Sequence, residues 1–118
     1  MKIPIYYIDA FTDKLFSGNP AAVIFSDIND SDLMQKIAQE NNLSETAFIK
    51  EDSGKFFIRW FAPSCEIDLC GHATLASAFV YFNFINQSAN EFIVHSKVNG
   101  PLYVSSSKDL LLLDFPKD

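Results

Sequence analysis

The sequence is short of positive charge and has no long apolar run. Its 118 residues carry 9 Lys and Arg against 15 Asp and Glu, which gives a formal net charge of −6. A surface of this sign repels the phosphate backbone, so we expect no nucleic-acid partner. No window approaches the run of about 20 apolar residues that spans a bilayer, so we expect no membrane partner either.

Cysteine is also scarce, and only Cys65 and Cys70 are present. The N-terminal segment has no apolar stretch followed by a small-residue cleavage site, which favours a cytoplasmic protein with free thiols. The glycine-rich motifs that hold nucleotides are absent. Cys65, Cys70 and His72 form a C-x₄-C-x-H pattern, but a fourth ligand at a zinc-site spacing is missing. The sequence therefore predicts neither a cofactor nor a metal.

What the chain does contain is apolar: 48% of its residues are hydrophobic and twelve are Phe. One domain of this size can build a core from such residues without disulfides. Alternating and apolar runs predict strands, and "DSG" with Gly54 predicts a tight hairpin turn. Further turns are predicted at Asn99-Gly100 and around Ser107-Lys108. The predicted strands cover 2–11, 21–26, 45–51, 55–61, 91–98, 100–107 and 109–116.

Two helices are predicted between these strands. The first runs for about three turns after an N-cap at Asp30 or Ser31, with Leu33, Ile37 and Ala38 apolar and Met34 beside them. The second covers 71–84 and is apolar or small on every face, so protein should enclose it on all sides. Since strands come mostly in adjacent runs, we predict an α+β domain. In this fold a curved, mostly antiparallel sheet forms a barrel-like wrap around the second helix.

The scarce reactive residues gather where this second helix begins. Backbone N–H groups near Gly71 lack intrahelical partners and favour a bound anion, such as a substrate carboxylate. His72 lies in the first turn, and Thr74 adds a hydroxyl that is a candidate substrate contact. The structural alternative is that Gly71 only eases the turn, His72 is a surface residue and Thr74 makes a local hydrogen bond.

Two more residues are candidates for proton transfer. Cys70 precedes the positive end of the helix, where the pKa of a thiol is lowered, so it is a candidate base or nucleophile. The alternative is an inert buried cysteine. Glu45 begins an otherwise apolar strand, and a desolvated carboxylate is suited to accept and return a proton near neutral pH. Ser44 is a candidate for orienting the substrate. Glu45 on a solvated surface is the competing interpretation.

Arg59, Trp60 and His95 are interpreted as structural. A packing Trp and an Arg that bridges a carboxylate are the ordinary explanation for the Arg-Trp pair on one strand of the hairpin. His95 stands alone on a later strand, with no second reactive side chain beside it in the sequence.

Four segments together carry a resemblance to a known family: "DAFTDKLFSGNPAAV", "NNLSETAFI", "IRWFAPSCEIDLCGHATLASAFV" and "LLLLDFP". In this order they resemble the N-terminal half of the phenazine-biosynthesis (PhzF-like) isomerases. That family is similar in fold to diaminopimelate epimerase and proline racemase, which have two like halves with the active site between them. The resemblance implies that Glu45 is the catalytic acid and base and that Gly71 and His72 line the cleft. Asn19 and Ser44 lie in matching segments and are predicted to bind substrate.

The resemblance implies a function as well as a fold. We expect cofactor-independent isomerisation of a small carboxylate-bearing substrate, in which Glu45 removes a proton from one carbon and returns it to another. Residues 1–118 would form the N-terminal half, so the expected partner is a C-terminal half or a second copy in a homodimer. One alternative is a non-catalytic remnant that binds a small acid or dimerises. Another is a two-base racemase that uses Cys70, where many PhzF-like members carry Ala.

Overall fold

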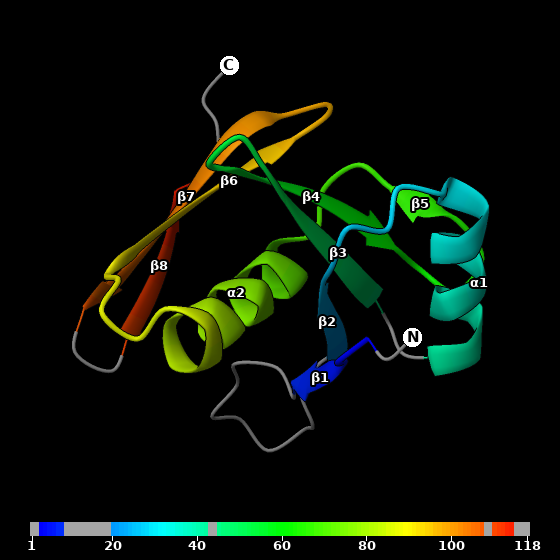
Figure 1. Ribbon diagram of the computed structural model, residues 1–118, viewed down its shortest axis with the longest axis horizontal. Coiled ribbons are helices and arrows are strands. Elements are labelled where there is room, and N and C mark those ends of the chain that lie inside the picture. The colour runs from blue at the N-terminus through cyan, green and yellow to red at the C-terminus, as the bar shows by residue number, and fades with distance from the viewer. Residues whose placement is uncertain (1–2, 9–19, 43–44, 108–109, 115–118) are drawn as a thin grey trace.

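The computed structural model describes residues 3–8, 20–42, 45–107 and 110–114 (Figure 1). Within these residues a single sheet runs in the order β1-β2-β3-β4-β6-β7-β8, with the short β5 paired to β4. The helical elements are α1 (Ser31–Asn41), α2 (Gly71–Val80) and a π-helical turn η1 (Tyr81–Ile85). The strands are β1 (Tyr6–Ile8), β2 (Ala21–Phe25), β3 (Glu45–Asp52), β4 (Lys55–Phe61), β5 (Glu66–Ile67), β6 (Glu91–Ser96), β7 (Gly100–Ser107) and β8 (Leu110–Asp114).

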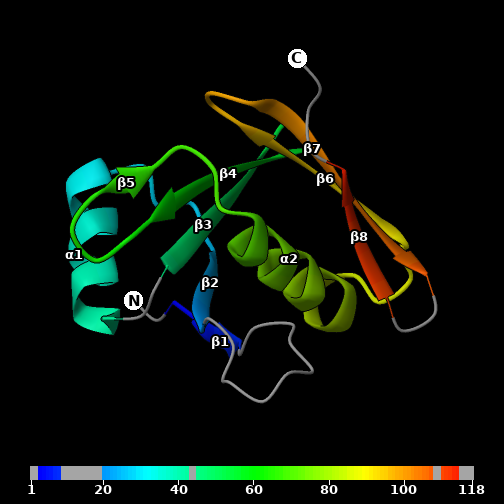
Figure 2. The same ribbon diagram turned by 180° about the vertical axis from the view of Figure 1, so that it is seen from behind.

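The sheet is mixed but mostly antiparallel. Only the β2–β3 and β4–β6 pairs are parallel among the described strands. The sheet curls into a half-barrel, and α2 lies between its β1–β4 part and its β6–β8 part (Figures 1 and 2). The predicted α+β class and curled sheet are therefore confirmed. No helix in the described part of the chain is long and apolar enough to cross a membrane.

The β3–β4 hairpin turns where the sequence predicts it. Asp52 pairs with Lys55 across a two-residue turn. Ser53 and Gly54 both have positive φ, at 55° and 80°, as a type I′ turn requires. The two-residue strand β5 was not predicted, because a segment this short shows no periodicity.

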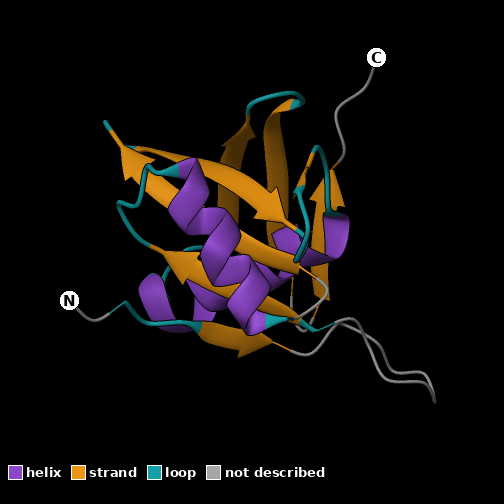
Figure 3. Cartoon of the chain, turned by 90° about the vertical axis from the view of Figure 1, so that its right-hand side faces the viewer, coloured by secondary structure: helices purple, strands orange, loops and turns teal. Residues whose placement is uncertain are grey.

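Helix α1 has the predicted N-cap but a different buried face. The Asp30 carboxylate accepts hydrogen bonds from the amides of Asp32 and Leu33 at 2.9 and 3.3 Å. Met34 and Ala38 are buried, whereas Leu33 is 43% exposed, so its assignment to the apolar face was wrong. The helix lies on the outer face of the sheet (Figure 3). Met34, the residue after Leu33, packs against the sheet in place of Leu33. A small core there joins Ile24, Met34, Ala38, Phe48 and Phe61.

Helix α2 packs inside the curl against β2, β3 and β8. Its Ala73, Ala76 and Ala78 are at most 1% exposed, and these small side chains let the helix approach the strands closely. The prediction of complete enclosure was wrong at the C-terminal end. The chain continues there as the π-helical turn η1, whose Phe84 and Ile85 are 59% and 45% exposed, because the half-barrel does not close around it.

Candidate active site

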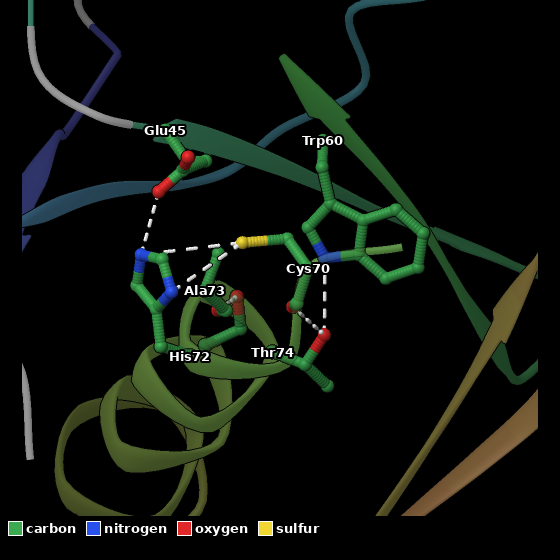
Figure 4. A network of polar contacts seen from close by, with 7 residues as sticks. Glu45, Trp60, Cys70, His72, Ala73 and Thr74 are labelled. Carbon is green, nitrogen blue, oxygen red and sulfur yellow. Dashed lines mark hydrogen bonds and ion pairs between the residues drawn. The ribbon is translucent and has the colours of Figure 1, made fainter. Parts of the chain in front are cut away.

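Three reactive side chains converge at the N-terminus of α2 (Figure 4). Glu45 is the first residue of β3, whose next four residues are buried, so the strand is held firmly in the sheet. Cys70 is the N-cap of α2, and His72 is the second residue of the helix. One ligand atom from each side chain lies within 4.8 Å of the other two. The fold therefore assembles the three catalytic candidates that the sequence proposed.

The carboxylate and the imidazole are in direct contact. His72 Nε2 lies 2.5 Å from Glu45 Oε1, and the two side chains are only 28% and 18% exposed. Oε1 has almost no exposed surface and makes no other hydrogen bond among the described residues. A shielded carboxylate beside an imidazole can accept a proton and return it. This contact makes Glu45 and His72 the main candidates for proton transfer among the described residues.

The thiol lies beside the same imidazole, near both ring nitrogens (Figure 4). Cys70 Sγ is 3.7 Å from His72 Nδ1. Burial raises the pKa of the Cys70 thiol to about 11, and the charge of Glu45 acts in the same direction. The amides of Ala73 and His72 oppose this rise but do not overcome it. The prediction of a lowered thiol pKa was therefore wrong, because desolvation outweighs the helix-end dipoles. The protonated thiol can donate to Nδ1, which leaves Nε2–H to donate to Glu45.

A buried hydrogen-bond chain fixes the first turn of α2. The indole N–H of Trp60 donates to Thr74 Oγ1 at 3.0 Å, and the Thr74 hydroxyl donates to the Cys70 carbonyl at 2.8 Å. Thr74 is 0% exposed and Trp60 is 2% exposed. The Thr74 hydroxyl, which was predicted to contact substrate, is enclosed and already engaged in these two bonds. The local hydrogen bond of the structural alternative is what forms.

Sequence reasoning missed the part played by Trp60. It treated the residue as a packing Trp, whereas its indole also links β4 to the start of α2. The spacing of Cys70 and Thr74 by four residues signalled the local bond. Nothing in the sequence paired Thr74 with a donor on another strand.

The N-terminus of α2 has open backbone groups. The first intrahelical bond runs from the Thr74 amide to the Cys70 carbonyl at 3.1 Å. The amides of Gly71, His72 and Ala73 therefore lack an intrahelical partner. Those of His72 and Ala73 face the Cys70 thiol and partly offset the rise in its pKa, but within the described chain no side chain makes a cap hydrogen bond to the helix. Such amides favour an anion. The predicted substrate contacts Ser44 and Asn19 lie outside the described residues.

The remaining candidates behave as structural residues. Arg59 forms a two-pronged contact with Glu66, at 2.8 and 2.9 Å, and a bond to Ser31. The hydrogen bond raises the pKa of Arg59 and lowers that of Glu66. The ring of His95 packs beside that of Phe57. The predicted bridging Arg is therefore confirmed.

The two cysteines have different surroundings. Both are free thiols in the structure, but Cys65 is exposed and Cys70 is buried. Cys65 is not part of the three-residue cluster, in which Glu45 joins Cys70 and His72 instead. The C-x₄-C-x-H pattern in the sequence therefore does not describe the group of side chains that the fold brings together.

Comparison with known proteins gives consistent matches. The family model described as phenazine biosynthesis-like protein matches residues 8–111. An uncharacterized isomerase of Halalkalibacterium halodurans is 44% identical over 119 residues, covering 100% of this chain and 45% of the relative. A human phenazine biosynthesis-like domain-containing protein is 46% identical over 125 residues, covering 98% of this chain and 43% of the relative. A crystal structure of an Enterococcus faecalis PhzF family protein superposes with a TM-score of 0.86 at 46% identity, covering 94% and 43%. The chain spans less than half the length of these relatives.

Proposed function

Because the chain belongs to the phenazine biosynthesis-like protein family, we propose that it supplies the proton-transferring side of an isomerase active site. The proposed substrate is a small molecule with a carboxylate, and the reaction moves a proton between two of its carbons without a cofactor. The observation that carries this proposal is the shielded Glu45–His72 contact beside the open amides of α2.

The proposed mechanism gives each group one task. The substrate carboxylate accepts hydrogen bonds from the free amides at Gly71 and His72, which orients the substrate. Glu45 takes a proton from one carbon while the electron pair of the broken C–H bond stays on the substrate. The protonated carboxyl group then returns the proton to a second carbon, so the reaction is redox-neutral. His72 holds the carboxylate through Nε2 and fixes its direction.

Cys70 has no proton-transfer step in this proposal. Burial keeps its thiol protonated near neutral pH, so it is a poor base at that site. Its side chain packs beside the imidazole and leaves Glu45 as the group that exchanges protons with substrate. The two-base alternative would require the Cys70 thiolate, which desolvation disfavours.

We propose further that residues outside these 118 complete the site. The curated relatives are more than twice as long as the chain, which covers 43–45% of them. Carbon acid chemistry needs a site closed to water, and a second half or a second copy would supply that closure. The exposed Phe84 and Ile85 at the far end of α2 offer apolar surface for such a contact.

The experiment measures exchange of carbon-bound hydrogen in D₂O. The chain, alone and mixed with the C-terminal half of the Halalkalibacterium relative, is incubated with a panel of small unsaturated and amino acids. Nuclear magnetic resonance then reports deuterium at carbon. Glu45→Gln should abolish the exchange, whereas Glu51→Gln, on the same strand but exposed, should not change it.

Each of the other outcomes decides between alternatives. Equal exchange by Glu45→Gln and the unsubstituted chain would contradict the proposed base. Loss of exchange in Cys70→Ala but not in Glu45→Gln would support the two-base racemase. Saturable binding of a carboxylate without any exchange in either mixture would support a small-acid-binding remnant.

A further inference from the structure

We propose that Glu45, Cys70 and His72 form a binding site for a thiophilic divalent cation such as Zn²⁺. Binding at these atoms would also block the proton transfer described above, and only that second statement rests on the proposed function. The site itself is inferred from ligand chemistry and geometry.

The three side chains offer the atoms that zinc prefers: a carboxylate oxygen, a thiolate sulfur and an imidazole nitrogen. Cys70 Sγ and His72 Nδ1 are 3.7 Å apart. Two such atoms on one tetrahedral Zn²⁺, with Zn–S near 2.3 Å and Zn–N near 2.0–2.1 Å, lie roughly 3.5–3.6 Å apart. Glu45 completes a set of three whose ligand atoms all lie within 4.8 Å of one another. Because Glu45 contacts Nε2 of the same ring, the imidazole and the carboxylate would have to rotate for all three side chains to bind one ion.

The backbone that presents these ligands is held in place. Cys70 and His72 share the first turn of α2, which is fixed by the Trp60–Thr74–Cys70 hydrogen-bond chain. Glu45 lies at the start of a strand paired on both sides. Three protein ligands leave a fourth position for water, as in zinc sites that bind exogenous ligands. His72 is 28% exposed, so the cluster can be reached from solvent.

Charge balance favours a soft cation at this position. The positive end of α2 disfavours a bare cation, but a carboxylate and a thiolate together neutralise a divalent ion. The S–H bond breaks when the metal binds, the sulfur–metal bond forms and the proton passes to solvent. Mg²⁺ and Ca²⁺ prefer oxygen ligands, so a site with one sulfur and one nitrogen selects against them.

Cobalt is the probe because its thiolate complexes absorb light. Titration of the full chain with Co²⁺ should give one bound ion per chain and a sulfur-to-cobalt charge-transfer band, which one equivalent of Zn²⁺ should remove. Cys70→Ala should abolish the band and weaken Zn²⁺ binding by about 100-fold, because the sulfur ligand is lost. His72→Ala and Glu45→Gln should each weaken binding by about tenfold or more.

The chain offers a matched control for each ligand type. Cys65→Ala removes the exposed thiol and His95→Ala removes the second histidine, and both should leave the cobalt spectrum unchanged. A cobalt complex without the sulfur band, or undiminished Zn²⁺ binding by Cys70→Ala, would overturn the site. Fluorescence of Trp60, the only Trp, reports whether each variant folds. If Cys70→Ala does not fold, the binding of Zn²⁺ by Glu45→Gln, a change at a more exposed side chain, tests the site instead.

The two proposals fail separately. If carbon-bound hydrogen exchange depends on Glu45 but no cobalt binds through sulfur, the isomerase proposal stands and the metal site falls. If cobalt binds through Cys70 but no substrate exchanges, the reverse holds. If both stand, Zn²⁺ should inhibit the exchange and a chelator should restore it.

Discussion

The two helices of this fold begin in opposite ways. Asp30 caps α1 with its own carboxylate, which accepts bonds from two first-turn amides. Cys70 occupies the same position in α2 but makes no side-chain cap bond. Both helix ends face the same shortage of backbone partners. The N-cap of α1 thus satisfies two of its first-turn amides, whereas the first-turn amides of α2 have no side-chain cap beside Glu45.

The open end is anchored by buried hydrogen bonds and the capped end by an exposed one. The first residue of α1, Ser31, accepts an exposed hydrogen bond from Arg59 on β4, and Leu33 in the same turn is exposed. The first turn of α2 is tied to β4 through the buried Thr74 and Trp60. Residues that bind a substrate or a metal must keep the binding geometry even when the ligand is absent. The comparison therefore indicates that buried hydrogen bonds to β4 hold the first turn of α2 in place, which leaves the backbone amides at its end free for a ligand.

The largest expected effect tests whether the dipole of α2 or burial controls the pKa of the Cys70 thiol. With a pKa of about 11, only about one Cys70 in a thousand is a thiolate at pH 8. Alkylation of Cys70 by iodoacetamide at pH 8 should therefore be slow, and its rate should rise about tenfold per pH unit toward pH 11. Mass spectrometry of the labelled peptides would measure this rate. The exposed Cys65 should label promptly in the same sample, and faster labelling of Cys70 would contradict the burial argument.

The second prediction gives α2 the kind of cap that α1 has. In Cys70→Asp the new carboxylate would occupy the free amides and repel the substrate carboxylate. We expect KM for the acid that exchanges in the D₂O assay to rise by about 100-fold or more, the scale of a lost charge-assisted contact. The same substitution at the exposed Cys65 is the control. An unchanged KM in Cys70→Asp would mean that the substrate does not use these amides.

The third prediction breaks the anchor beneath α2. Thr74→Val leaves the buried indole N–H of Trp60 without its acceptor, so the free energy of unfolding should fall by about 1–3 kcal/mol. Urea denaturation followed by circular dichroism measures the change. Ser77→Ala is the matched control on the same helix, because that hydroxyl is equally buried but, among the described residues, bonds only the Ala73 carbonyl of its own helix. Its loss should be smaller.

A double variant sharpens this test. Adding Trp60→Phe to Thr74→Val removes the unpaired donor, so the pair should cost less than the sum of the two single changes. Simple additivity would show that the Trp60–Thr74 bond does not couple β4 to α2.

These features were not equally visible in the sequence. The Asp30 cap and the Ser53–Gly54 turn were predictable because both depend on residues that are adjacent in the chain. The lowered pKa predicted for Cys70 was wrong, and its burial agrees with the alternative of a buried cysteine, because the sequence gives its position at a helix end but not its depth. The Thr74–Trp60 bond joins two elements, and its geometry depends on how the sheet curls. Local signals thus locate the site, while tertiary packing decides the chemistry of its members.

The smallest expected effect concerns the capped helix. Asp30→Ala removes the acceptor for two amides of α1 and should lower the free energy of unfolding by about 1 kcal/mol. Asp27→Ala, an exposed acid just before the helix, should change it by less than about 0.5 kcal/mol. Because α1 packs on the outer face of the sheet, carbon-bound hydrogen exchange should not change in either variant. Reduced exchange in Asp30→Ala at unchanged folding would show that α1 is coupled to the site, and the contrast between the two helix ends would then not be a division between stability and chemistry.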